Sequence, residues 1–208
     1  MDLSKTFEEQ GHPLEPLVMC FGGDKKYDII YADPPWRYYG NVVLAKSSLL
    51  GGKNDIVYNS MSIDELKKLP VQNISANKSL LFMWVASPKL DEGIELMIHW
   101  GFKYSTIGFI WYKQSTNPGY YTMSECEICI IGRRGGIPSP RGKRNVRQFL
   151  SEKSRAHSAK PFEIRKRIEE MFPTQKKIEL FARDKSELFN GYGFEGWDVW
   201  GNEAPKHT

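Results

Sequence analysis

Residues 27–36 read Tyr-Asp-Ile-Ile-Tyr-Ala-Asp-Pro-Pro-Trp, and this stretch predicts a buried strand that ends at an acid. The run Ile-Ile-Tyr-Ala is apolar without alternation, which is typical of a strand covered on both faces. Neither proline can donate a sheet hydrogen bond, and each restricts the residue before it. Asp33 therefore stands where the strand stops and a rigid turn begins, and open α/β sheets bind ligands at such carboxyl ends.

The rest of the chain predicts one α/β domain spanning residues 1–208. A length of 208 residues, with 40% hydrophobic and 26% charged residues, suits a single globular domain. Further strands are expected at 17–21, 79–85, 104–113, 125–131, 177–183 and, as a short final strand and turn, within 196–203. Because helical segments alternate with these strands, we expect a mostly parallel sheet with helices on both faces.

Three helices are expected between the strands. The first begins at Ser62, which forms a capping box with Glu65, and it ends at Pro70. The second covers 88–100, and the third begins at Pro161 and reaches about residue 172. Their predicted apolar stripes are Leu90, Ile94, Met97 and Ile98 in the second helix, and Ile164, Ile168 and Met171 or Phe172 in the third.

Two segments have the composition of substrate loops. Residues 37–60 follow Asp33 directly and have neither a helical nor a strand period. The second loop is expected at 133–158. Residues 133–160 carry nine Lys/Arg and one acid, so this segment has a charge of +8 in a chain whose net charge is +4. The remainder carries −4, and a basic block in an otherwise acidic protein indicates a polyanionic partner. A solvated surface loop is the alternative interpretation of the basic block.

Several other classes of protein lack support in the sequence. Cys126 and Cys129 form a single C-x-x-C on a predicted strand, where positions i and i+3 face opposite ways, so we predict structural thiols and no metal site. No G-x-G-x-x-G follows a strand, so a nicotinamide cofactor is not expected. The absence of a long apolar run and of a signal-peptide core predicts a cytoplasmic protein without a membrane partner.

The Asp-Pro-Pro-Trp turn suits an amine that is attached to an aromatic ring, such as the exocyclic amine of adenine. The nitrogen lone pair is delocalised into the ring, so the amine is a poor nucleophile. A carboxylate that accepts one N–H and a backbone carbonyl that accepts the other would favour a pyramidal nitrogen. Trp36, or Tyr38 or Tyr39, could stack on the base, a contact worth about 1–3 kcal/mol. A simple strand-ending turn is the alternative interpretation.

The turn is similar to motif IV of amino-methyltransferases that use S-adenosylmethionine. Further segments, in the same order along the chain, resemble the MT-A family of adenine-N6 methyltransferases, which includes the catalytic subunit of the eukaryotic mRNA adenine methyltransferase. They are Tyr-Asn-Ser-Met-Ser at 58–62, Leu-Phe-Met-Trp-Val at 81–85, Trp-Gly-Phe at 100–102, Ile-Trp-Tyr-Lys at 110–113, His-Ser-Ala-Lys-Pro at 157–161, Lys-Ile-Glu-Leu-Phe-Ala-Arg at 177–183 and Trp-Gly-Asn-Glu at 200–203.

The resemblance implies a Rossmann-like methyltransferase with a permuted motif order, in which the catalytic strand comes first and the cofactor strand comes last. It implies that the acceptor amine is held by Asp33, Pro34, Pro35 and Trp36. It also implies that S-adenosylmethionine is surrounded by Asp33, Lys160, Phe181, Arg183, Asn202 and Glu203. Residues expected to contact the substrate are Tyr38 and Tyr58 near the catalytic turn and Arg141, Lys143, Arg144 and Arg147 in the basic block.

The residue pattern bears on some of these positions independently. Glu179, Phe181 and Arg183 are expected to share one face of their strand by period two, with Arg183 near its carboxyl end. A structural ion pair is an equally good interpretation of Glu179 and Arg183. Lys160 precedes a helix that begins with proline, a place suited to a carboxylate.

Three functions remain open on the sequence. The first is methylation of adenine N6 in DNA, the second is the same reaction on RNA, and the third is a catalytically silent nucleic-acid-binding partner. The intact Asp33 argues against the third. The chain is similar to prokaryotic or phage members of the family, so DNA is favoured over RNA, and both a monomer and a homodimer remain open.

Overall fold

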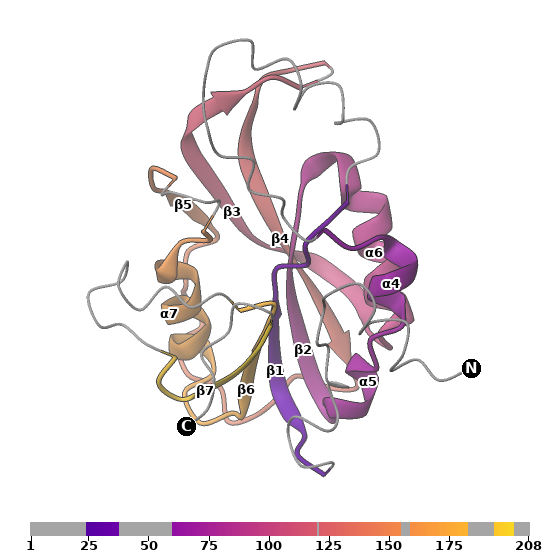
Figure 1. Ribbon diagram of the computed structural model, residues 1–208. Coiled ribbons are helices and arrows are strands. Elements are labelled where there is room, and N and C mark those ends of the chain that lie inside the picture. The colour runs from indigo at the N-terminus through magenta and orange to yellow at the C-terminus, as the bar shows by residue number, and fades with distance from the viewer. Residues whose placement is uncertain (1–23, 38–59, 120, 155–158, 183–193, 202–208) are drawn as a thin grey trace.

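The computed structural model describes residues 24–37, 60–119, 121–154, 159–182 and 194–201 (Figure 1). The described residues form one seven-stranded sheet with the strand order β5-β3-β4-β2-β1-β6-β7. The strands are β1 (Tyr27–Ala32), β2 (Ser75–Val85), β3 (Lys103–Asn117), β4 (Ser124–Arg134), β5 (Phe149–Ser151), β6 (Lys177–Leu180) and β7 (Trp197–Trp200). The strand expected at 17–21 lies outside the described residues.

The sheet is mostly parallel, as predicted. β1 pairs in parallel with β2 and β6, β6 with β7, and β3 with β5. Among the described strands, only β4 is antiparallel to its neighbours, which are β2 and β3. β1 therefore lies beside β6, with Ala32 opposite Leu180, although the two strands are far apart along the chain. This neighbourhood agrees with the permuted order of strands expected from the sequence.

Helices cover both faces of the sheet, which confirms the predicted fold class. The helices are α4 (Ile63–Lys67), α5 (Val71–Ile74), α6 (Leu90–His99) and α7 (Phe162–Met171), with a short 3-10 turn, η1 (Ser87–Lys89). Figure 1 shows α4, α5 and α6 on one side of the central strands and α7 on the other. Among the described residues, no helix has the length and apolar content needed to cross a membrane.

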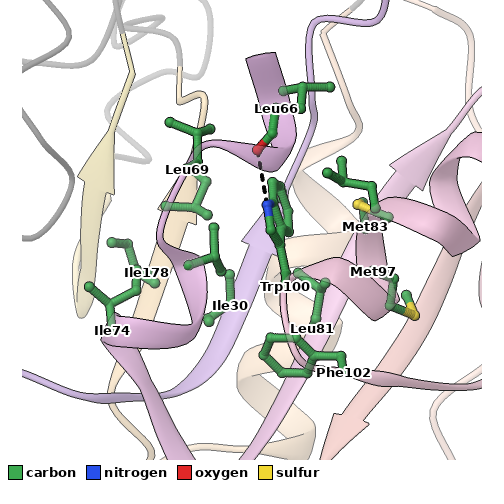
Figure 2. Close-up of a cluster of buried hydrophobic side chains, with 14 of the residues drawn as sticks. Ile30, Leu66, Leu69, Ile74, Leu81, Met83, Met97, Trp100, Phe102 and Ile178 are labelled. Carbon is green, nitrogen blue, oxygen red and sulfur yellow. Dashed lines mark hydrogen bonds between the residues drawn. The ribbon is translucent and has the colours of Figure 1, made fainter. Parts of the chain in front are cut away.

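The larger part of the core lies between the sheet and α4, α5 and α6 (Figure 2). Ile30, Leu81 and Ile178 come from three neighbouring strands and are fully buried there. Trp100 is also fully buried, and its indole nitrogen donates to the Leu66 carbonyl at 3.0 Å, which ties α4 to the end of α6. A second cluster packs Ile164, Ile168 and Phe172 of the α7 segment against the opposite face.

Local capping residues explain where the helices begin. Ser62 accepts from the Glu65 N–H, and Glu65 accepts from the Ser62 N–H, so the predicted capping box is present. Pro161 is the N-cap of α7 and has an extended conformation, so the helix begins at Phe162, one residue after the predicted start at Pro161. In α6 the apolar face consists of Leu90, Ile94, Leu96 and Met97, and the prediction for Ile98 was wrong because its side chain is 61% exposed.

Several elements are longer or shorter than expected. β2 begins at Ser75, directly after α5, and β3 and β4 extend past the predicted ends into a long hairpin. β5 lies inside the segment expected to be loop, where it adds a short parallel strand to β3. β6 ends at Leu180, because Phe181 has a left-handed backbone with a φ of 62°.

The expectation that Glu179 and Phe181 share one face was wrong. Glu179 faces α7, where it meets Arg165. Phe181 leaves the strand with its positive φ and packs with Trp200 on the opposite side. The period-two argument fails because the strand ends one residue before Phe181.

Candidate active site at the carboxyl ends of the central strands

Asp33 lies at the carboxyl end of β1, between β2 and β6. Its backbone N–H donates to the Leu180 carbonyl at 3.5 Å, a long contact that continues the pairing with β6. The neighbour of β1 on one side is β2, the next strand along the chain. Its neighbour on the other side is β6, which comes near the C-terminus. Such a reversal of strand order opens a crevice outside the sheet, and ligands bind there in open α/β proteins.

The turn after Asp33 is held by backbone hydrogen bonds. The Trp36 N–H donates to the Pro34 carbonyl at 2.9 Å. The Met61 N–H donates to the Pro35 carbonyl at 2.7 Å, and the Arg37 N–H donates back to the Met61 carbonyl at 3.0 Å. The segment before α4 is thus fastened to the turn, and the direction of the Asp33 side chain is set by two fixed proline rings.

Trp36 anchors this turn in the core. Its side chain is only 9% exposed, and its indole nitrogen donates to the Trp84 carbonyl at 3.2 Å. The ring therefore has little free surface on which a base could stack, contrary to one option that the sequence offered. The other two options for stacking, Tyr38 and Tyr39, lie outside the described residues.

Four charged side chains lie together on the α7 face of the sheet, near its carboxyl edge. The Lys160 ammonium is 2.9 Å from Asp33 Oδ2 and 3.2 Å from Glu127 Oε2. The other oxygen of Glu127 is 3.5 Å from the Lys113 ammonium. The charges alternate in sign along the series Lys113, Glu127, Lys160 and Asp33, which we call the charged row.

The charged row is partly buried, so its charges depend on one another. The side chains of Lys113, Glu127 and Lys160 are 9%, 19% and 13% exposed. Burial alone would lower the pKa of Lys160, but the carboxylates of Asp33 and Glu127 outweigh it and raise that pKa above its ordinary value. Lys160 is therefore an ammonium at neutral pH, and it also lies 5.7 Å from the centre of the Trp84 ring.

Glu127 and Lys113 were not among the predicted site residues. Glu127 lies within the C-x-x-C segment, two residues before Cys129, and strand periodicity places both on the α7 face. The sequence signal that could have pointed to it is an acid at an inward position of the strand, on the same face as Cys129. Lys113 ends the Ile-Trp-Tyr-Lys segment and is buried to the same degree as apolar core residues.

The C-x-x-C pair has no metal partners among the residues that the structure describes. No group of three or more His, Cys, Asp and Glu side chains there could hold an ion. Cys129 is fully buried, and burial raises the pKa of its thiol well above the ordinary value, with Asp33 adding to the effect. Cys129 is thus a neutral core thiol.

On the β6 side of Asp33, two backbone segments approach each other closely. The Ala182 N–H donates to the Trp200 carbonyl at 3.0 Å. A Cβ on Gly201 would lie 2.6 Å from the Ala182 carbonyl oxygen and 2.9 Å from the Phe181 carbonyl carbon, so only glycine fits. This packing fixes the left-handed turn at Phe181 beside the carboxyl end of β1.

Glu179 and Arg165 form a buried pair beneath the site. Arg165 Nη2 and Glu179 Oε2 are 2.5 Å apart, and the guanidinium lies over the rings of Phe162 and Phe194. Burial raises the pKa of Glu179, Arg165 opposes this, and the net direction is upward. Glu179 therefore has Arg165 as its ionic partner here, whereas the pair that the sequence offered was between Glu179 and Arg183. Arg183 lies outside the described residues.

The basic segment splits between the two ends of α7. Lys143 pairs with Glu170 at 3.0 Å and Arg141 stacks 5.2 Å from the centre of the Phe172 ring, so both lie at the C-terminal end of α7. Lys160 and Asp33 lie at the N-terminal end, and a helix of 10 residues is about 15 Å long. The structure therefore does not bring Arg141 and Lys143 to the charged row.

The segment then returns toward the catalytic end. The Arg147 and Phe149 carbonyls accept from Arg167 in the middle part of α7. The Ser154 N–H donates to the Lys113 carbonyl at 3.1 Å, which places the exposed Lys153 close to the charged row. Arg144 and Arg147 are also exposed. Tyr58, Asn202 and Glu203, which were predicted to contact substrate or cofactor, lie outside the described residues.

The fold and the site together define an α/β enzyme of the Rossmann-like methyltransferase class, with an acid at the point where the strand order reverses. The family model described as MT-A70 matches residues 27–203. The chain belongs to the MT-A70 family, whose methyltransferases use S-adenosylmethionine as methyl donor.

Individual relatives fall into two groups. Type II methyltransferase M.MunI of Mycoplasma sp is 43% identical over 192 residues, which are 87% of this chain and 79% of that protein. The human N(6)-adenosine-methyltransferase catalytic subunit METTL3 is 26% identical over 186 residues, 86% of this chain and 28% of that protein. An N(6)-adenosine-methyltransferase MT-A70-like protein of Arabidopsis thaliana is also 26% identical over 186 residues, 85% of this chain and 24% of that protein. The chain thus spans about a quarter of the length of these eukaryotic relatives.

The described residues fit the methyl donor. An ammonium has three N–H donors, and Asp33 and Glu127 account for two of those on Lys160. The third can bind the carboxylate of the methionine moiety. The close approach of Gly201 to the backbone of Phe181 and Ala182 fixes the turn after β6, on the side of Asp33 where the cofactor residue Phe181 is expected.

Proposed function

We propose that the protein transfers the methyl group of S-adenosylmethionine to the N6 amine of adenine in DNA. The observation that carries the proposal is the Asp33 carboxylate, held by a hydrogen-bonded proline turn and paired with Lys160 at 2.9 Å. A catalytically silent protein would have no need to keep an acid and a partly buried lysine together at this point, because burying charge is costly. The 43% identity to Type II methyltransferase M.MunI, against 26% to the human catalytic subunit METTL3, favours DNA.

In this mechanism the acceptor amine donates one N–H to the Asp33 carboxylate and the other to the Pro34 carbonyl. The Pro34 oxygen accepts from the Trp36 N–H and has a second lone pair for this purpose. The two hydrogen bonds favour a pyramidal nitrogen, whose lone pair then points at the electrophilic methyl group that the donor supplies. The nitrogen becomes acidic once it is alkylated, so no strong base is needed and positioning supplies most of the rate.

A duplex substrate adds one requirement. The N6 amine of a paired adenine is engaged within the base stack, so the target base must be extruded, at a cost of a few kcal/mol. The exposed cations near the charged row, such as Lys153, are placed to hold phosphates beside the extruded base. Methylation of adenine in RNA is the second candidate, and the relatives named N(6)-adenosine-methyltransferases favour it.

The test offers labelled S-adenosylmethionine with duplex DNA, single-stranded DNA and RNA, followed by digestion of each product to nucleosides. We expect label in N6-methyldeoxyadenosine. Label only in N6-methyladenosine would move the function to RNA, and label in neither would contradict the proposal.

Replacement of the acid provides the matched variant. Asp33→Asn should lower kcat by at least about a hundredfold, because the amide cannot replace the anionic acceptor. The protein should stay folded, since Lys160 retains Glu127 as its partner. Asp91→Asn, an exposed acid in the first turn of α6, serves as control and should leave kcat unchanged. If Asp33→Asn transferred methyl groups at the wild-type rate, the Asp33 carboxylate would have no part in the mechanism.

A further inference from the structure

Glu127 contacts two different ammonium groups in the charged row. Its Oε2 is 3.2 Å from Lys160 and its Oε1 is 3.5 Å from Lys113. The side chain is 19% exposed and comes from β4, which is antiparallel to β2 and β3. A carboxylate this far from water must be paired to be tolerated, and Lys113 alone would provide a pair. The shorter contact is nevertheless the one to Lys160.

Glu127 gives Lys160 a second anionic partner, which matters when the acceptor amine binds to Asp33. Asp33 holds Lys160 through Oδ2, and in the proposed reaction the same carboxylate must accept a hydrogen bond from the substrate. With Asp33 as its only anionic partner, the lysine would compete with the substrate for that carboxylate. With Glu127 on its other side, the ammonium keeps a charge-assisted hydrogen bond while Asp33 turns toward the amine.

Lys113 completes the arrangement. It neutralises the second oxygen of Glu127, so two ammonium groups face two carboxylates and the charged row carries no net charge. The lysine is itself buried, and its ammonium pairs with Glu127. Glu127 is thereby fixed from the side away from the substrate, and its position does not depend on whether Asp33 is occupied.

We infer that Glu127 is a positioning residue, which holds the Lys160 ammonium in place when the Asp33 carboxylate binds the acceptor amine. This inference rests on the proposed methyl transfer for its catalytic consequence. The contact between Glu127 and Lys160 stands on the structure alone and can be tested without substrate.

The kinetic test compares Glu127→Gln with Glu125→Gln, a variant of an exposed acid on the same strand and two residues away. Glu127→Gln should lower kcat at least about tenfold. A displacement of about 1 Å in an active site can lower the rate about a hundredfold, so a smaller shift of Lys160 is enough for this effect. The KM for S-adenosylmethionine should stay unchanged or fall, since Lys160 has lost a competing anion. Glu125→Gln should change neither constant.

Glu127→Asp keeps the charge on a side chain one methylene shorter. It should give a kcat between that of the wild type and that of Glu127→Gln, and it carries the test if the amide variant does not fold. A wild-type kcat in Glu127→Asp and Glu127→Gln, or a rise in KM without a change in kcat, would overturn the inference.

The test without substrate follows the Lys160 ammonium by NMR in protein that contains 15N-labelled lysine, with its signal assigned by its loss in Lys160→Arg. Glu127 raises the pKa of Lys160, so Glu127→Gln should lower that pKa and Glu125→Gln should not. An unchanged pKa in Glu127→Gln would overturn the inference even if the enzyme is active. Failure of the wild type to methylate any nucleic acid, with the pKa shift present, would instead count against the proposed function.

Discussion

At the scale of single residues, the site depends on side chains that are held by more than one partner. Lys160 bridges two carboxylates, Glu127 bridges two ammonium groups, and Trp36 is both a core residue and a donor to Trp84. Such shared contacts hold each group in one preferred position. A reaction whose rate depends on positioning requires side chains that are fixed in this way.

Gly201 offers a test of the cofactor side of the site. Gly201→Ala should weaken S-adenosylmethionine binding by at least about tenfold and destabilise the fold by about 1–3 kcal/mol, because the new methyl group would overlap the backbone at Phe181 and Ala182. Calorimetric titration of the cofactor and denaturant unfolding measure the two effects.

The control for this variant is Gly136→Ala. A Cβ there would meet only the Lys78 side chain at ordinary distances of 3.6 Å or more. It should change neither quantity. If Gly201→Ala bound S-adenosylmethionine with wild-type affinity, the Phe181 turn would not be part of the cofactor site.

At the scale of elements, α4 is a short helix that supports the catalytic turn. Its capping residue follows Met61, which hydrogen-bonds to the turn through its N–H and its carbonyl. Glu65 closes the capping box and also pairs with Arg37 at 3.2 Å. A helix of 5 residues is not stable by itself, so its cap and its packing decide whether the turn is held.

The capping box predicts a pH dependence of stability. Burial would raise the pKa of Glu65, but hydrogen bonds from Ser62 and the charge of Arg37 outweigh it, so the pKa lies below its ordinary value of 4.5. A carboxyl whose pKa is lowered by folding stabilises the protein above its unfolded pKa, and the contribution is lost as the pH falls through the folded value. Glu65→Gln should therefore cost about 1 kcal/mol at pH 7, and nothing at a pH below the folded pKa.

Unfolding in denaturant at a series of pH values measures this difference. The control is Asp64→Asn, which changes a neighbouring exposed acid that is not part of the capping box, and it should show a smaller difference. A cost of Glu65→Gln that stays constant from neutral to acid pH would show that packing, and not the charge, is responsible.

At the scale of the whole molecule, the basic segment divides into a part at the C-terminal end of α7 and a part that returns to the catalytic end. Arg141 and Lys143 are held at the C-terminal end of α7, whereas Arg147 and Lys153 lie along the return to the catalytic end. The sequence alone predicts that Arg141, Lys143, Arg144 and Arg147 belong to one phosphate-binding surface.

Two double variants with equal loss of charge test the division. Arg147→Gln with Lys153→Gln should weaken nucleic-acid binding and reduce the slope of log K against log salt by up to about 2, since each phosphate contact contributes about 0.9. Arg141→Gln with Lys143→Gln should leave the slope unchanged and lower stability. Equal slopes in the two variants would contradict the division, because both pairs of cations would then contribute equally to nucleic-acid binding.

The sequence by itself determined the local features of this protein. The strand that ends at Asp33, the proline turn, the capping box and the alternation of strands with helices follow from side-chain pattern and backbone restriction over a few neighbouring residues. The order of the motifs was also sufficient to place the chain in its family. These properties are readable because propensity, capping and turn geometry act within about one turn of helix or one strand.

The tertiary structure decided which of these pieces meet. Lys160 reaches Asp33 across 127 positions of chain, and Glu127 joins them only because β4 lies between β2 and β3. Trp36 became an anchor of the core, and Phe181 left the face of Glu179, because packing and a left-handed turn overrode the local pattern. Contacts between distant segments depend on strand order and register, and no short-range pattern encodes either.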